Sequence, residues 1–192
     1  WGVVHSRTRS VVFSAAVVKR HAGLGPGGID AIYSTPDGGG ASTVVTNVGG
    51  VGTVPDDATR GLGASNSPSD DSTVYSTVGT VGIGDIDLSD DETELWYTNL
   101  SDGDLYRLPI GAPPAVTPGA PVSVGMGTAV CVNGTLRPWA VKYYGGKVYV
   151  GAVCDASGDA VTLGSSDSNL VAHVFVYDPV GNSWAEAIAP FT

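Results

Sequence analysis

The sequence predicts an all-β fold made of short antiparallel strands. Its 192 residues include 28 Gly and 12 Pro, together with many Val and Thr. Runs of Leu, Ala, Glu and Lys at helical spacing are missing. This composition favours many short strands joined by turns. A strand–turn–strand pattern also recurs along the chain, which is long enough for one domain with a sizeable core.

The first predicted unit covers about residues 1–50. Its first two strands are GVVHS and VVFSAAV, joined by the polar turn RTRS. A third strand, AIYSTP, has aromatic character, and a weaker fourth strand, STVVTNV, follows it. We expect these four strands to form an antiparallel meander.

The second unit, about 81–126, repeats this order as GDIDLS, LWYTNL, DLYRLPI and APVSVG. The third, about 135–190, reads PWAVKYY, KVYVGAV, HVFVYDP and SWAEAIA, with Gly145-Gly146 as a tight turn between its first two strands. Two polar insertions, 54–80 and 155–169, interrupt the series and read as surface loops.

Four-stranded units repeated about every 50 residues are the sequence mark of a β-propeller. The whole of 1–192 is therefore predicted to be a single propeller segment with about three blades. Because rings usually hold about four to eight blades, three cannot close one. We expect further blades, or another chain, to complete it. A β-sandwich of the same strands remains the alternative.

The charge and the apolar pattern bear on partners and location. The net charge is −10, which argues against nucleic acid and against anionic membrane surfaces as partners. No apolar run reaches the roughly 20 residues of a membrane helix, so no membrane insertion is expected. The start WGVVHS lies inside a strand-like pattern, and we expect a processed chain or part of a longer one.

Cys131 and Cys154 flank the predicted hairpin of residues 137–154. The acidic, lysine-poor composition is typical of extracellular proteins, which favours a disulfide between them over two buried thiols. In the chain-entropy model, a loop of this size stabilises the fold by about 3 kcal/mol.

Several side chains are candidates for calcium binding or glycosylation. Asp85, Asp87 and Asp90 crowd one strand and its turn and could bind calcium, although an acidic turn that faces water is the alternative. Asn99 and Asn133 begin glycosylation triplets. No cofactor is expected, with calcium at the three aspartates as the one candidate, and no nucleophile motif is present.

Three further residues are candidates for a central channel or an interface: Arg137, Trp139 and His21. Arg137 either points into the channel or pairs with an acid. His21 follows Lys19-Arg20 and could bind a metal, although a turn is the alternative. Trp96, Trp139 and Tyr143 could stack on a sugar or peptide, or form core between blades.

Residues 11–33, 84–110 and 137–157 resemble consecutive blades of bacterial cell-surface propeller proteins that carry SdrD-B-like repeats. The resemblance implies an extracellular structural or adhesive protein and supplies no catalytic residues. Expected partners are other protein chains or further blades, in a homo-oligomer or a filament. The alternatives are a calcium-dependent hydrolase or lactonase and a propeller that binds glycans or peptides.

Overall fold

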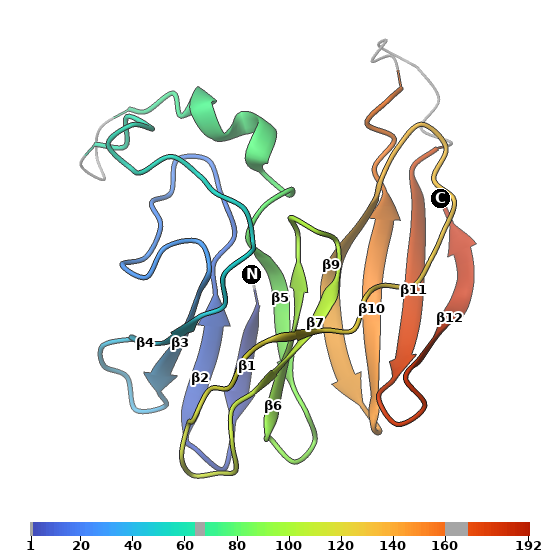
Figure 1. Ribbon diagram of the computed structural model, residues 1–192. Coiled ribbons are helices and arrows are strands. Elements are labelled where there is room, and N and C mark those ends of the chain that lie inside the picture. The colour runs from blue at the N-terminus through green and yellow to red at the C-terminus, as the bar shows by residue number, and fades with distance from the viewer. Residues whose placement is uncertain (1, 64–67, 160–168) are drawn as a thin grey trace.

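The structure, a computed structural model, describes residues 2–63, 68–159 and 169–192. It consists of three separate four-stranded antiparallel sheets (Figure 1). The prediction of an all-β fold is therefore confirmed, and so is the grouping of the strands into three sets of four.

The first sheet follows chain order and contains β1 (Val3–Ser6), β2 (Val11–Ala15), β3 (Ala31–Pro36) and β4 (Thr43–Asn47). The second sheet has the same order, with β5 (Ile83–Leu88), β6 (Glu94–Asn99), β7 (Leu105–Pro109) and β8 (Val122–Ser123). β8 has only two residues. Pro118 and Pro121 precede it, and proline has no N–H to donate to a sheet.

The third sheet has the longest strands: β9 (Leu136–Tyr144), β10 (Lys147–Cys154), β11 (Val171–Asp178) and β12 (Ser183–Phe191). The φ angles of Gly145 and Gly146, which join β9 to β10, are 58° and 76°. Positive φ at both positions is what a type I′ hairpin turn requires, and glycine adopts it without steric cost. The predicted two-glycine turn is present.

The first strands of the three sheets make the most extensive contacts between neighbouring sheets. β5 contacts β1 on one side and β9 on the other, so the three first strands lie together and the sheets spread out from them (Figure 1). Within the part of the chain that the structure describes, the sheets do not close into a ring. The structure therefore shows three stacked four-stranded sheets in an open arrangement.

Alternation along the strands of the second sheet produces two hydrophobic cores. One face of β6 carries Leu95 and Tyr97, and the other carries Trp96. The first core comprises Phe13, Val18, Ile29, Ile32, Val51, Val74, Ile83, Ile86, Leu88, Leu95, Tyr97, Leu108 and Ile110. The second comprises Trp96, Leu105, Val141, Val148, Val150 and Tyr177. The second sheet is thus covered on both faces, which explains why nearly all of β6 is buried.

The structure differs from the sequence-based expectation in the insertion 54–80, which is more than a surface loop. It contains a 3₁₀ helix, η1 (Ser72–Thr77), whose Val74 is fully buried in the first core. Arg60 and Asp71 of this insertion are also buried. In the second insertion, residues 160–168 lie outside the described residues. Among the described helices, none is long and apolar enough to cross a membrane.

Candidate functional site

The two predicted calcium ligands on β5 contact the first strand of the third sheet. Asp85 Oδ2 accepts the backbone N–H of Val141 at 3.0 Å, and Asp87 Oδ2 accepts that of Tyr143 at 2.7 Å. Lys142 Nζ also lies 2.8 Å from Asp87 Oδ2. N–H groups two residues apart point to the same edge of a strand. Alternate carboxylates on β5 therefore fasten the second sheet to the free edge of β9.

Asp90, the third predicted ligand, is exposed in the turn after β5 and is not part of that arrangement. In residues 2–63, 68–159 and 169–192, no three His, Cys, Asp or Glu side chains are grouped so that they could hold a metal ion. Calcium binding at Asp85, Asp87 and Asp90 stays a prediction.

A neighbouring acid links the first and second sheets. Glu92, in the turn between β5 and β6, accepts bonds from Ser6 Oγ at 2.6 Å and from the backbone N–H of Arg7 at 3.0 Å. Burial acts to raise the pKa of Glu92, but the hydrogen bonds from Ser6, Thr8 and Arg7 hold it below its ordinary value. The acidic turn is thus a connection between two hairpin turns, which the charge pattern alone did not show.

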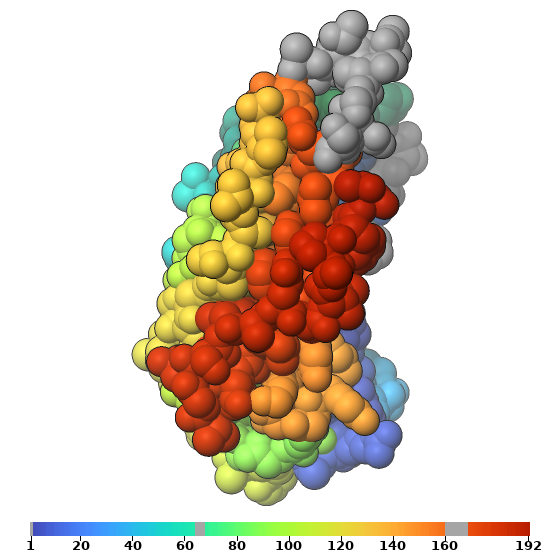
Figure 2. Space-filling view, turned by 90° about the vertical axis from the view of Figure 1, so that its right-hand side faces the viewer, coloured from blue at the N-terminus to red at the C-terminus, as the bar shows by residue number. Residues whose placement is uncertain are grey.

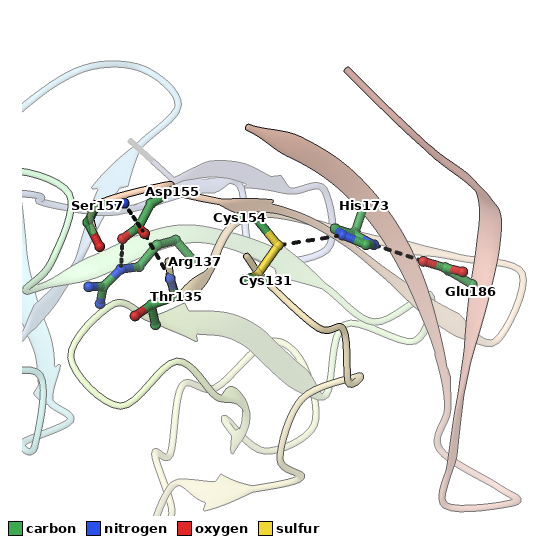
Figure 3. The surroundings of a disulfide bond; sticks show 8 residues. All are labelled: Cys131, Thr135, Arg137, Cys154, Asp155, Ser157, His173 and Glu186. Carbon is green, nitrogen blue, oxygen red and sulfur yellow. Dashed lines mark hydrogen bonds and ion pairs between the residues drawn. A yellow bond between two sulfur atoms is a disulfide. The ribbon is translucent and has the colours of Figure 1, made fainter. Parts of the chain in front are cut away.

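The predicted disulfide is present: Cys131 and Cys154 are bonded, with Cα atoms 5.3 Å apart (Figure 3). It ties the segment leading into β9 to the end of β10. Nε2 of His173, on β11, lies 3.8 Å from Cys154 Sγ, and its Nδ1 lies 2.8 Å from a carboxylate oxygen of Glu186 on β12. The disulfide, the histidine and the glutamate therefore form a diagonal chain of contacts across β10, β11 and β12.

Beside the disulfide, Arg137 donates from Nε to Asp155 Oδ2 at 2.8 Å (Figure 3). Asp155 also accepts the backbone N–H groups of Thr135 and Ser157. Burial opposes ionisation of Asp155, yet these donors hold its pKa far below the ordinary value. Arg137 therefore forms an ion pair with an acid, which is the second of the two roles considered for it from the sequence.

The two glycosylation candidates differ in exposure. Asn99 is only 1% exposed, and its amide nitrogen donates to the carbonyl of Gly50 and to a carboxylate oxygen of Asp102. A glycan on that nitrogen would displace these bonds. Asn133 is exposed, and its amide donates to Asp159 at 2.8 Å. Glycosylation at either residue stays a prediction.

The aromatic candidates separate into core and surface. Trp96 is 1% exposed, and its ring centroid lies 6.3 Å from that of Tyr143 and 5.9 Å from that of Tyr177. These rings are core between the second and third sheets. Trp139, by contrast, is 39% exposed and borders a groove. Only Trp139 of the predicted stacking residues is placed to meet a ligand through that groove.

The groove has a volume of about 690 Å³ and lies where the segment after β2, the insertion 54–80 and β9 meet. Among the described residues, its lining comprises Val17, Val18, Lys19, Arg20, Tyr75, Val78 and Trp139. Arg20 lies over the ring of Tyr75, with its guanidinium carbon 5.4 Å from the ring centroid. Cations, aromatic rings and aliphatic side chains are therefore brought together from three parts of the chain.

A buried ion pair holds the wall of the groove in place. The side chains of Arg60 and Asp71 are both 0% exposed, and Arg60 Nη2 lies 2.9 Å from Asp71 Oδ2. Arg60 Nη2 also donates to the carbonyls of Lys19 and Ala22. His21 is part of the same junction: its backbone N–H donates to Asp71 at 2.6 Å, so the structure gives it a role in a turn.

Sequence reasoning missed Arg60, Asp71 and Tyr75, because all three lie in the segment read as a polar loop. A signal was available in retrospect, since Arg60 is the one basic residue of 54–80 and stands among several acids. An isolated cation in such a segment is a candidate for an ion pair that organises it. Its partners, however, depend on how distant segments pack.

We found no significant match between the chain and any family model, any characterised protein or any solved structure. The interpretation of the site therefore rests on its own geometry.

Proposed function

We propose that the chain is part of an extracellular, non-enzymatic structural or adhesive protein. In this proposal its three sheets are blades of a β-propeller of the bacterial cell-surface kind, and it contacts other protein through open sheet faces. Three features support the proposal: the identical strand order of the three sheets, the meeting of their first strands, and the disulfide, which suits an oxidising compartment.

The observation that carries the proposal is the outer face of the third sheet. Buried residues of β10 and β11 alternate with half-buried or exposed ones, because one face packs on the second sheet and the other does not. The outer face holds three cross-strand rows: Tyr149, Val176 and Ala185; Gly151, Val174 and Ile188; and Val153, Ala172 and Phe191. Figure 2 views the molecule from this side, where segments of β10 to β12 form the surface.

This outer face is apolar, as expected for a face that is buried against another protein surface. Val153, Ile188 and Phe191 are 36%, 51% and 53% exposed. An antiparallel sheet that faces water normally carries polar residues on that face, and a contiguous apolar patch marks an interaction site. Strands that are apolar on both faces belong in the middle of a stack.

The second sheet indicates which kind of structure would pack on this outer face. Its corresponding face carries Trp96 and is covered by the third sheet. The outer face of the third sheet is the equivalent surface, so we expect another four-stranded antiparallel sheet to pack on it. That sheet is either a further blade of the parent protein or a blade of a second copy, in an oligomer or a filament.

The test is sedimentation velocity on the 192-residue chain over a wide concentration range, combined with binding of a dye specific for apolar surface. We expect concentration-dependent association and dye binding, both reduced strongly by Ile188→Asp. The matched control is Val180→Asp, because Val180 is 96% exposed but lies in the turn between β11 and β12. A chain that stays monomeric and binds no dye contradicts the proposal.

The calcium-dependent hydrolase has no structural observation in its favour. The carboxylates of Asp85 and Asp87 are engaged with backbone N–H groups of β9.

A further inference from the structure

The groove beside Trp139 has the size of a binding site, and parts of its wall are held by contacts to the rest of the fold. Its volume of about 690 Å³ lies within the range of roughly 300–1,000 Å³ that is usual for ligand sites. The carbonyl of Trp139 accepts a bond from Thr98 Oγ1 at 2.8 Å, which joins this part of β9 to β6. A Cβ built on Gly79 would lie 3.5 Å from Cζ3 of the Trp139 indole, so Gly79 also packs against this ring. Preformed walls reduce the entropy lost on binding.

The charge of the groove is opposite to that of the molecule. The chain carries a net charge of −10, yet Lys19 and Arg20 are adjacent on the groove wall. Arg20 donates from Nη2 to the carbonyl of Asp70 at 2.7 Å, and its Nε is buried without a hydrogen-bond partner. Among the described residues, Arg20 has no carboxylate at ion-pair distance, although other cations of the chain do. An anionic ligand would complement this charge.

The remaining lining is apolar. Tyr75 is 71% exposed and Trp139 is 39% exposed, and half-exposed Val78 lies beside them, with the buried Val17 and Val18 behind. Sugar ligands need several polar groups around an aromatic platform. Three valines and two rings instead suit an aliphatic or aromatic side chain, which would be desolvated on binding.

From this combination we propose that the groove binds an acidic peptide segment, in which a hydrophobic side chain stands next to a carboxylate. The hydrophobic side chain packs against Trp139, Tyr75 and Val78, and the carboxylate meets Arg20. This site does not share residues with the outer face of the third sheet. The inference therefore does not rest on the proposed function, and either can fail alone.

The test is calorimetric titration of the full chain with the peptide Ac-Asp-Leu-Glu-Ile-Asp-NH2. Its amide analogue, with Asn and Gln in place of the acids, and an oligogalacturonate serve as comparison ligands. We expect the acidic peptide to bind and the amide analogue to bind about tenfold more weakly or not at all. Salt should weaken the binding of the acidic peptide, because its attraction is electrostatic.

The variants Trp139→Ala, Tyr75→Ala and Arg20→Gln should each weaken binding about tenfold. Tyr75 is largely exposed, so its substitution reports on binding even if another variant fails to fold. Matched controls are Tyr144→Ala, an aromatic residue of β9 that is 71% exposed outside the groove lining, and Arg7→Gln, an exposed cation elsewhere. Both should leave binding unchanged.

Three results would overturn the proposal: no heat of binding for the acidic peptide, equal affinity of the groove variants and the wild type, or binding of the oligogalacturonate in preference to the peptide. The last result would assign the groove to an acidic glycan. A melting curve for each variant establishes that it is folded before its affinity is compared.

Discussion

At the scale of single residues, buried charges hold the loops of this protein. The Arg9 side chain is 1% exposed and donates to the carbonyls of Glu92, Gly111 and Ala115, which anchors the turn between β1 and β2 on the second sheet. Arg60 does the same for the insertion 54–80, with the carboxylate of Asp71 as its partner. A buried guanidinium with several acceptors connects segments that have little apolar surface of their own.

The Arg60–Asp71 pair should make stability depend on pH in acid. The hydrogen bonds from Arg60 lower the pKa of Asp71 to about 2. Because the folded pKa lies below the unfolded value, this stabilisation is present above about pH 4 and is lost as the pH falls towards about 2. We expect Asp71→Asn to be less stable than the wild type near neutral pH, and to lose less stability than the wild type across this acid range. Thermal melts followed by circular dichroism at several pH values measure both effects.

Asp70→Asn is the matched control, since Asp70 is the adjacent carboxyl group and is exposed. Its melting temperatures should follow those of the wild type. If Asp71→Asn retained the full acid dependence of the wild type, another carboxyl group would be responsible for it.

At the scale of elements, the hairpin of β9 and β10 is the most constrained part of the chain. The two-glycine turn closes one end of the hairpin. The disulfide, between cysteines 23 residues apart in sequence, closes the other end. Arg137 and Asp155 pair beside the disulfide at the same end. Both ends of the hairpin are therefore defined by local chemistry.

Removal of the disulfide should lower the free energy of unfolding by about 3 kcal/mol, because the denatured chain is then no longer cross-linked. The variant Cys131→Ala/Cys154→Ala should melt roughly 6–12 °C below the oxidised wild type. A reductant added to the wild type should produce a similar loss, and it should not affect the double variant. An equal melting temperature for oxidised wild type and double variant would contradict a stabilising role.

At the scale of the whole molecule, neighbouring sheets are joined by apolar cores and by acids. The second core packs around Trp96, and Asp85 and Asp87 bind the edge of β9 above it. Edge strands expose backbone donors that invite pairing with other strands. Here, two of those donors are satisfied by carboxylates of the next sheet, so the sheets associate without forming one continuous ladder.

The substitution Asp87→Ala should test this junction. Asp87 is 4% exposed, and its loss leaves the backbone N–H of Tyr143 without a partner. An unsatisfied buried donor costs about 1–3 kcal/mol, which corresponds to a melting temperature lower by roughly 2–12 °C. Asp90→Ala is the control, because Asp90 is exposed in the turn, and we expect a change within about 0.5 kcal/mol. Equal effects of the two substitutions would contradict the role assigned to Asp87.

The same two variants decide the calcium prediction. If Asp85, Asp87 and Asp90 form a calcium site, added calcium should raise the melting temperature of the wild type, and both substitutions should remove that increase. If the carboxylates act only on β9, added calcium and a chelator should leave all three melting curves unchanged.

The sequence predicted the strands well because strand patterns are local. The strand-like runs AIYSTP and KVYVGAV of the repeated units located β3 and β10 to within a residue of their observed ends, and the double glycine located the turn between β9 and β10. The insertion 54–80 was predicted less well. Its structure depends on Arg60 and Val74, whose partners belong to other parts of the chain.

The sequence by itself therefore determined the all-β class, the three sets of four strands, and the cysteine pair, since each follows from composition or from local patterns along the chain. Only the tertiary structure decided which groups the acids and cations contact. Asp85 and Asp87 meet residues 56 positions away, and the wall at Arg20 contacts Asp70, 50 positions away. Such partners are set by how sheets and loops pack in space, and no periodicity in the sequence encodes that packing.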